Sequence, residues 1–362
     1  MIALIIITFL FLCLYVFMQQ PVFGKTPTGK QMEYFKQSPN YRDGKFQNLN
    51  HTPDINEEDT YLSVMKKFFF EKSKRVKPKH RIPSVKTDLK TLTKERNMLV
   101  WFGHSSYFMQ LDGKRILVDP VLSGSASPVS FTTRSFLGTD IYSAEDMPDI
   151  DYLFITHDHY DHLDFKTMKK LKPKIGKVIC GLGVKEHLNH WGIDCLIEEK
   201  DWNEELILDE GFTVNTTPGR HFSGRKFKRN QSLWMSFVLK TPTMKVFIGG
   251  DSGYDTHFKT IGDIYGPFDF AILECGQYNS SWKYIHMMPE ETVQASIDLN
   301  SSNLLALHWG KFSLSIHDWD EPIKRAFISS GEKDVRLLTP MIGEPVNLVG
   351  ENSFENWWEN IN

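Results

Sequence analysis

The sequence has few cysteines, little net charge and no internal repeat. Only four cysteines occur among 362 residues, and no pair has C-x-x-C spacing. This argues against a disulfide framework or a thiolate zinc site, and cysteines 180, 195 and 275 are expected to be simple buried thiols. The formal net charge of −3 argues against a general nucleic-acid-binding protein. No period of 20–50 residues is visible, which argues against a repeat architecture.

One apolar run stands at the N-terminus, from Ile2 to Met18. Its 17 residues are at the short end of the range for a membrane-spanning helix. A secretory signal fits less well, because no Lys or Arg precedes the run and no small-x-small site follows it. A lipobox around Cys13 fails because Leu12 stands where a small residue is needed. We therefore predict an uncleaved membrane anchor in residues 1–19.

The next segment, residues 20–96, is expected to be an arm or linker without a periodic pattern. Residues 20–60 are rich in Pro, Gly, Asn and Gln. By the positive-inside rule, the lysines at 25, 30 and 36 favour a cytoplasmic catalytic domain. Residues 66–81 carry eight basic side chains, which form either a solvated helix face or a patch for anionic lipid headgroups. These eight are Lys66, Lys67, Lys72, Lys74, Arg75, Lys77, Lys79 and Arg81.

From about residue 97 the pattern changes to short strands separated by helices. Asp112-Gly113 is typical of a tight hairpin turn. Because strands outnumber helices and helices separate them in both halves, we predict an α/β fold, an αββα sandwich, over residues 97–350. The expected strands are 98–102, 106–111, 115–118, 152–156, 178–180, 206–208, 212–217, 233–240, 244–248, 269–273 and 304–307, and the expected helices are 164–171, 184–191 and 289–299.

A cluster of metal-ligand side chains directly follows the apolar run 152–156. It reads His157-Asp158-His159-Tyr160-Asp161-His162, or H-x-H-x-D-H. Imidazole and carboxylate groups suit zinc, and also iron or manganese. The loop leaving the carboxyl end of a strand is where open α/β sheets place their sites. A single ion needs three or four ligands, and one loop rarely supplies more than these. Since this loop alone offers four ligand side chains, we expect two metal ions to share it.

Three further residues have the same setting at the end of an apolar strand. His221 follows the stretch 212–217, Asp251 follows Phe247-Ile248-Gly249-Gly250, and His308 follows the run 304–307. Each position alone is a weak signal. A sandwich whose strand ends converge on one edge would gather all of them, with the first cluster, in one cleft.

Together these residues resemble the metallo-β-lactamase superfamily. More narrowly, the chain resembles the N-acyl-phosphatidylethanolamine-hydrolysing phospholipase D branch and its bacterial relatives, over about residues 97–350. Besides the H-x-H-x-D-H cluster, the matching motifs are Phe102-Gly103-His104-Ser105, Leu117-Val118-Asp119-Pro120, Ser125-Ala126-Ser127-Pro128, Gly250-Asp251-Ser252-Gly253-Tyr254, Gly266-Pro267-Phe268-Asp269, His286-Met287-Met288-Pro289-Glu290-Glu291 and His308-Trp309-Gly310-Lys311-Phe312.

The resemblance implies a centre of two zinc ions, with iron or manganese as alternatives. His157, His159 and His221 would hold the first ion, and Asp161, His162 and His308 the second. Asp251 would bridge the two beside a hydroxide.

The resemblance also suggests roles around the metals. Asp161, as a ligand of the second ion, and His286, facing the substrate phosphate, are expected to act in catalysis. Asp119 is the first candidate to orient a ligand imidazole and Asp164 the second, with a helix N-cap as the alternative for Asp164. Further candidates for the cleft are Tyr278, Tyr160 and His104. The chain departs from the animal enzyme at two points. Ile285 precedes His286 here, whereas the animal enzyme has a polar residue before this histidine. The segment 278–286 is also shorter in this chain.

The predicted function is a zinc-dependent phosphodiesterase acting on phospholipids of the N-acyl-phosphatidylethanolamine type. Its partners would be the phospholipid and a membrane surface, with no nucleic acid and with a homodimer left open. A first alternative keeps the chemistry but takes a lactone or a soluble phosphodiester. A second alternative, a membrane-tethered scaffold without activity, predicts lost ligands, whereas all seven ligand positions are filled.

Overall fold

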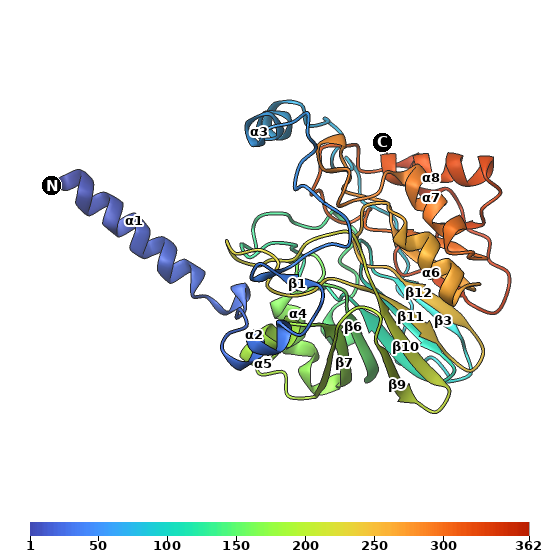
Figure 1. Cartoon of the computed structure of the whole chain (residues 1–362). Helices are drawn as coiled ribbons and strands as arrows, with labels where there is room; N and C mark the ends of the chain where they lie inside the picture. Colours follow the sequence, from blue (N-terminus) through green and yellow to red (C-terminus); the bar gives the residue numbers. More distant parts are fainter. Residues whose placement is uncertain (362) are drawn as a thin grey trace.

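The computed structural model describes residues 1–361 and contains two seven-stranded sheets packed face to face (Figure 1). The first sheet has the order β16-β3-β4-β5-β6-β7-β8, with strands β3 (Met98–Trp101), β4 (Tyr107–Leu111), β5 (Lys114–Val118), β6 (Ile150–Ile155), β7 (Ile175–Gly181), β8 (Leu196–Lys200) and β16 (Pro345–Asn347). The second has the order β15-β14-β13-β12-β11-β10-β9, with β9 (Glu205–Asp209), β10 (Phe212–Thr217), β11 (Ser236–Lys240), β12 (Lys245–Ile248), β13 (Phe270–Glu274), β14 (Leu304–Leu307) and β15 (Leu337–Leu338).

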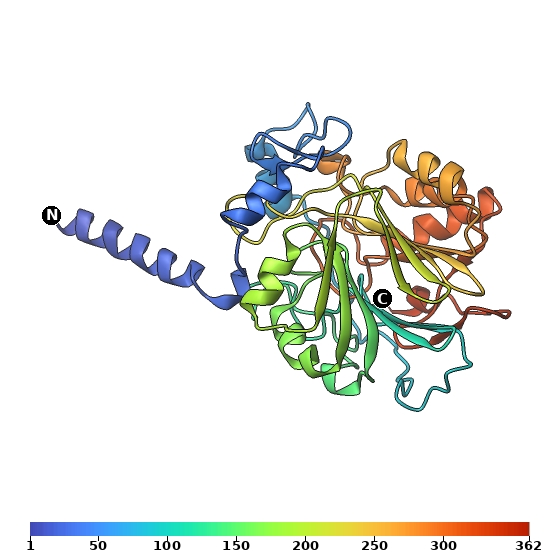
Figure 2. The ribbon, with the colours of Figure 1, turned by 60° about the horizontal axis from the view of Figure 1, so that its bottom comes forward.

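Helices cover the outer face of each sheet. Helices α4 (Phe165–Leu171) and α5 (Val184–His190) lie on the first sheet, and α6 (His257–Tyr265), α7 (Pro289–Asp298) and α8 (Glu321–Glu332) lie on the second (Figures 1 and 2). The side-chain alternation of β6 shows how the layers form, because Phe154 joins the core between the sheets while Leu153 and Ile155 join the core beneath α4 and α5. Because both faces of β6 are buried in this way, its sequence is an almost continuous apolar run.

The predicted αββα fold is confirmed, and all the strands and helices expected in residues 97–350 form within a few residues of their predicted bounds. Three substantial elements were missed: β8, α6 and α8. These elements lie at the margin or on the outside of the sandwich, so their sequences are more polar than those of the buried strands, as in Leu196-Ile197-Glu198-Glu199-Lys200. They therefore lack the apolar pattern by which the other elements were predicted.

The N-terminal region runs over one side of the sandwich. It contains α1 (Ile2–Met18), the short helix η1 (Pro21–Phe23), α2 (Lys30–Phe35), the hairpin of β1 (Tyr41–Arg42) and β2 (Lys45–Phe46), and α3 (Tyr61–Phe70). Phe35 and Phe46 belong to the core between the sheets. At the other end of the chain, Trp357 and Trp358 join the same core.

The prediction of a membrane-spanning anchor in residues 1–19 is not supported. The apolar run does form a helix, and α1 extends away from the body of the molecule (Figures 1 and 2). Its 17 residues give a helix of about 25 Å at 1.5 Å per residue, whereas a bilayer core is about 30 Å thick. Within residues 1–361, no helix combines the length and apolarity needed to cross a membrane.

Candidate metal centre

The candidate centre lies where several strands of both sheets end. Strand β6 lies between β5 and β7, parallel to both, so its carboxyl end opens at the same edge as theirs. The loop 157–163 leaves β6 at this edge. From the facing sheet, the loops after β10, β12 and β14 carry His221, Asp251 and His308 to it. The structure thus brings together all seven side chains that the sequence singled out.

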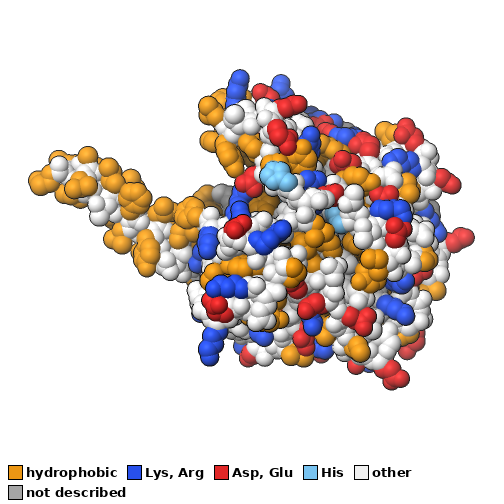
Figure 3. Space-filling model, in the orientation of Figure 1, with side chains coloured by type: hydrophobic (Ala, Val, Ile, Leu, Met, Phe, Trp, Pro, Cys, Tyr) orange, Lys and Arg blue, Asp and Glu red, His pale blue; other side chains and the backbone are white. Residues whose placement is uncertain are grey.

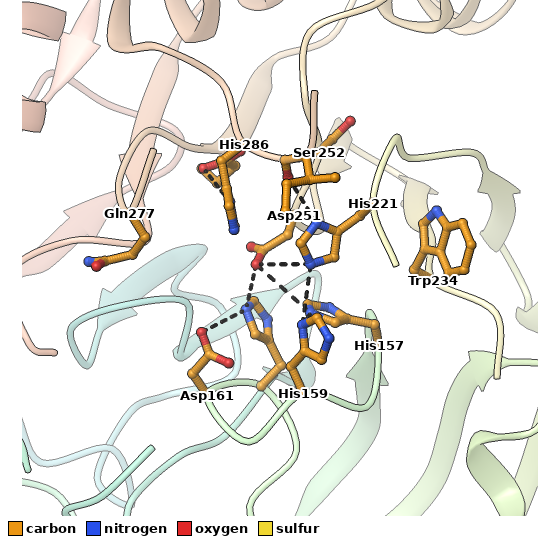
Figure 4. Close-up of polar contacts among 12 residues, drawn as sticks. His157, His159, Asp161, His221, Trp234, Asp251, Ser252, Gln277 and His286 are labelled. Atoms are coloured by element: carbon orange, nitrogen blue, oxygen red, sulfur yellow. Dashed lines mark hydrogen bonds and ion pairs between the residues drawn. The ribbon is translucent and has the colours of Figure 1, made fainter. Parts of the chain in front are cut away.

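The first group contains His157, His159 and His221, whose ring nitrogens all lie within 4.8 Å of one another. His157 Nε2 and His159 Nδ1 are 2.9 Å apart, and His159 Nδ1 and His221 Nε2 are 3.2 Å apart. Figure 4 shows the three rings turned toward one another and toward Asp251. This convergence agrees with the predicted first ligand set, three imidazoles on one ion.

The second group contains Asp161, His162 and His308 together with His104. The Asp161 carboxylate oxygen Oδ2 lies 3.6 Å from His162 Nε2, 3.9 Å from His308 Nε2 and 2.9 Å from His104 Nε2. His104 is completely buried and adopts a positive φ of 55°, an uncommon conformation for a residue other than glycine. His104, expected only as a cleft residue, is thus in direct contact with a predicted ligand.

Asp251 lies between the two groups. Its Oδ2 atom is 3.8 Å from His157 Nε2, 3.7 Å from His221 Nε2 and 3.2 Å from His162 Nε2. Its Oδ1 atom is 3.2 Å from His308 Nδ1. A carboxylate that faces both groups is placed as a bridging ligand would be.

The donor set fits divalent cations. Burial holds the pKa values of His157, His221 and His308 well below the usual value, so these rings are neutral and their lone pairs are free for coordination. His162 is different, because Asp251, Asp161 and Asp119 overcome the effect of its burial and raise its pKa. The buried atoms His162 Nε2 and Asp251 Oδ1 have no hydrogen-bond partner among the described residues. A cation at this point would satisfy both of them.

Asp119 supports the centre as predicted. At the end of β5, it lies 2.7 Å from His162 Nδ1 and accepts hydrogen bonds from the Thr156 amide (2.9 Å) and hydroxyl (2.6 Å). Oriented in this way, His162 turns Nε2 toward the other ligands. Similarly, His221 Nδ1 lies 2.8 Å from the carbonyl oxygen of Ile285, and Ser105 Oγ lies 2.7 Å from His308 Nδ1.

The structure confirms the N-cap alternative for Asp164, and neither Tyr160 nor Tyr278 is among the described residues that line the cavity at the centre. Asp164 caps helix α4, where it accepts from the Lys166 amide and the Thr167 hydroxyl. The Tyr160 hydroxyl donates to the carbonyl oxygen of Arg225, and the Tyr278 hydroxyl donates to Glu321. These three side chains are committed to nearby loops and helices, which the residue type alone does not reveal.

His286 is not one of the seven predicted ligands, but it faces the centre, and one of its ring nitrogens lies within 4.8 Å of ligand atoms of His221 and Asp251 (Figure 4). Its ring centroid lies 5.0 Å from that of His221 and 5.2 Å from that of His308. Its Nδ1 atom is 3.5 Å from Oε2 of Glu274, the last residue of β13. Burial raises the pKa of Glu274 to about 7, and the charges of Glu274 and Asp251 outweigh the burial of His286 and raise its pKa.

Glu274 is a candidate site residue that the sequence analysis missed. It is almost fully buried, and its Oε1 atom accepts a 2.8 Å hydrogen bond from the Met287 amide. It therefore fixes the segment that follows His286, while its Oε2 atom faces the imidazole at 3.5 Å. A signal was available, since a glutamate that ends a wholly apolar strand, Phe270-Ala271-Ile272-Leu273-Glu274, needs a buried partner.

A cavity of about 340 Å³ opens above the centre. Its floor includes His159, Asp161, His221, Asp251, His286 and His308, while its walls and rim carry the apolar side chains Ile55, Tyr61, Val64, Phe222, Trp282, Ile285 and Leu314. Arg229 and Asp54 form a 3.3 Å ion pair at the rim. The cavity therefore combines a polar, metal-binding floor with an apolar entrance.

Fold and site together define a metal-dependent hydrolase. The chain belongs to the beta-lactamase superfamily, whose domain profile matches residues 114–309, more than half of the chain. The profile match establishes the superfamily of the chain and leaves its substrate unspecified.

Individual relatives agree with this assignment. An uncharacterized protein of Mycobacterium tuberculosis is 36% identical over 89% of this chain and 88% of its own length. An N-acyl-phosphatidylethanolamine-hydrolyzing phospholipase D of Caenorhabditis elegans is 30% identical over 60% of this chain and 65% of its own. Among solved structures, a metallo hydrolase of Ignicoccus hospitalis superposes with a TM-score of 0.54, at 20% identity over 69% of this chain and 97% of its own, which supports the fold.

Proposed function

We propose that the protein is a phospholipase D-type phosphodiesterase that acts on N-acyl-phosphatidylethanolamine and related phospholipids. The observation that carries the proposal is the cavity, whose apolar entrance leads to a polar floor that can bind two metals. A molecule with a phosphodiester between an apolar tail and a small headgroup matches this gradient. The similarity to the C. elegans phospholipase supports the same substrate class.

The proposed chemistry divides between the metals and His286. Two zinc ions bound by the seven ligands would supply Lewis acidity for the phosphoryl group and for an attacking water. His286 lies outside the ligand groups and faces the same space, so it is placed to donate a proton to the departing alkoxide oxygen or a hydrogen bond to a phosphoryl oxygen. The negative charge of Glu274, 3.5 Å from His286 Nδ1, favours the protonated form of the imidazole.

Lipid product analysis tests the proposal directly. Purified protein of measured metal content is incubated with micellar N-acyl-phosphatidylethanolamine, bis(p-nitrophenyl) phosphate and a lactone. We expect phosphatidic acid and N-acylethanolamine in the mass spectrum, formed faster than hydrolysis of either soluble compound. Turnover of the soluble diester or the lactone without lipid products would refute the lipid assignment while leaving the metal hydrolase intact.

We also propose that α3 brings the cavity to a membrane surface. Its side chains Tyr61, Leu62, Met65, Phe69 and Phe70 are between 54% and 81% exposed, an apolar surface at the rim of the cavity (Figure 3). Residues 66–81 supply exposed Lys and Arg beside it, which suits a bilayer that contains anionic lipid. Lys67 fixes this arm by ion-pairing with Asp59 at 2.8 Å and donating to Ser281 Oγ at 3.0 Å.

Removing the aromatic end of α3 should separate lipid binding from hydrolysis. The double change Phe69→Ser and Phe70→Ser is expected to weaken binding to vesicles of phosphatidylcholine and phosphatidylglycerol by at least about 100-fold, since each buried Phe contributes about 1.5–3 kcal/mol and the two together about 3–6 kcal/mol. Hydrolysis of the soluble diester should stay unchanged. The control is Ile207→Ser, which removes an equally exposed apolar side chain from β9 at the opposite end of the sandwich. Equal vesicle binding by the two variants would rule out α3 as the docking surface.

A further inference from the structure

A second buried polar cluster lies directly behind the metal loop. Arg225, in the loop after β10, is 4% exposed, and its Nη1 atom donates 2.7 Å hydrogen bonds to the carbonyl oxygens of Asp158 and Leu163. These two carbonyls bracket the stretch that carries His159, Asp161 and His162. The guanidinium also lies 4.2 Å from the ring centroid of Tyr160, in the middle of the same stretch. One side chain therefore holds the loop at both ends and at its centre.

Asp158 belongs to the same cluster. Like Tyr160, it is part of the H-x-H-x-D-H motif but is not a proposed metal ligand. Its carboxylate accepts from the Gly224 amide at 2.7 Å and from the Ser232 hydroxyl at 2.8 Å, and it lies 3.1 Å from His187 Nε2. His187 Nδ1 accepts from the Lys25 amide at 3.0 Å, so the proton of the neutral imidazole is on Nε2 and is donated to Asp158. The side chain between His157 and His159 is thus fixed from several directions.

The N-terminal strap, Pro21–Lys25, completes this cluster. Three of its backbone groups bind three side chains of the catalytic domain. The Pro21 carbonyl accepts from Trp191 Nε1 at 2.7 Å, the Val22 carbonyl accepts from Arg225 Nη2 at 2.8 Å, and the Lys25 amide donates to His187. In addition, the buried ring of Phe23 packs edge-on against Tyr160, with centroids 6.4 Å apart.

We propose that Arg225 and His187 are positioning residues for the metal loop, and that the strap Pro21–Lys25 holds them in place. A segment more than 130 residues before the first ligand thereby contributes to metal affinity. Without the strap, the Arg225 guanidinium would lose its Val22 partner and His187 its Lys25 partner, and the buried groups would have to find new ones. The inference concerns the metal centre and does not depend on which substrate is hydrolysed.

Two glycines near the strap provide a matched test. Gly24 and Gly29 have nearly the same positive φ, 64° and 58°. A Cβ atom on Gly24 would lie 2.1 Å from His187 Nδ1, whereas one on Gly29 would meet nothing within 4 Å. The backbone strain of an alanine is therefore similar at both positions, but only Gly24→Ala displaces His187.

The measurement is Zn²⁺ affinity of the full-length apo variants, by competition with a chromogenic chelator at a temperature where circular dichroism shows them folded. We expect Gly24→Ala to weaken Zn²⁺ binding by about 10- to 100-fold, the range for residues that support metal ligands. The Zn²⁺ affinity of Gly29→Ala should stay within about twofold of that of the parent protein, because its added Cβ atom touches no residue that supports a metal ligand. The metal-induced rise in melting temperature should shrink only in Gly24→Ala, which a loss of general stability would not produce.

A second variant covers the case in which Gly24→Ala does not fold. Arg225→Lys keeps the charge but loses the planar fork that reaches Asp158, Leu163 and Val22 together, so it should weaken Zn²⁺ binding by a similar factor. Unchanged affinity in folded Arg225→Lys would overturn the proposal. A second outcome would also overturn it. If Arg225→Lys binds Zn²⁺ weakly but folded Gly24→Ala binds Zn²⁺ as tightly as Gly29→Ala, the strap has no part in the metal centre.

Discussion

Replacement of Asp251 by alanine is expected to empty both metal positions. Its carboxylate faces both ligand groups and lies within 3.8 Å of four imidazole nitrogens, two of which belong to His157 and His221 of the first group and two to His162 and His308 of the second. Elemental analysis of the purified variant should find fewer than one ion per chain, against two in the parent protein. Hydrolysis should fall by at least about 10³-fold, because several kcal/mol of transition-state stabilisation would be lost with the metals.

Two controls make this result specific. Asp164→Ala removes a carboxylate from the same edge of the sandwich, but that carboxylate only caps α4, so both ions should remain. His308→Ala should weaken mainly the second position, leaving close to one ion per chain. If Asp251→Ala retained one tightly bound ion and lost only the other, Asp251 would be an ordinary ligand of one metal and the bridging assignment would be wrong.

Replacement of His286 by alanine should abolish most activity without removing metal. The seven proposed ligands remain in this variant, so metal content and melting temperature should match those of the parent protein, whereas loss of an ion would make His286 a ligand beside His221 and Asp251. Activity should fall about 10²- to 10⁴-fold, the usual range for a lost general acid or base. A substrate with a good leaving group needs little protonation, so its loss should be smaller if His286 donates a proton. Equal losses for good and poor leaving groups would instead assign phosphate positioning to His286.

Glu274→Gln tests the partner of His286 by pH dependence. The carboxylate helps to raise the pKa of His286, so the acid form persists toward higher pH and activity is lost as the pH rises through that raised pKa. The neutral amide removes this support. The alkaline limb of the pH–rate profile should therefore move to lower pH in Glu274→Gln, with metal content unchanged. A profile that does not move would mean that Glu274 is a structural residue only.

The candidate metal ligands could be picked out from the sequence because four of the seven lie within six consecutive residues. An apolar run ended by His157-Asp158-His159-Tyr160-Asp161-His162 specifies a buried strand and a loop of ligands at its end, both of which are local properties. His221, Asp251 and His308 required one further assumption, that strand ends meet at one edge. The parallel pairing of β12, β13 and β14 satisfies it for Asp251 and His308. For His221, β10 runs in the same direction as β12 because both are antiparallel to β11.

Other features depended on contacts that no local pattern encodes. Asp119 and Asp164 are both aspartates that follow apolar segments, yet Asp119 reaches His162 and Asp164 turns back onto its own helix. The apolar run Ile2–Met18 predicts a helix, and α1 forms, but its length falls short of a bilayer core.

The sequence by itself therefore determined the fold class and the family, and it picked out the seven side chains that converge at the candidate metal centre. These follow from strand periodicity and from residue types clustered within one loop or at one strand end. Only the tertiary structure placed Glu274 beside His286 and connected the strap Pro21–Lys25 to the metal loop through Arg225 and His187. The physical reason is that burial and long-range packing choose one hydrogen-bond partner for each polar group, and such partners lie far away in the sequence.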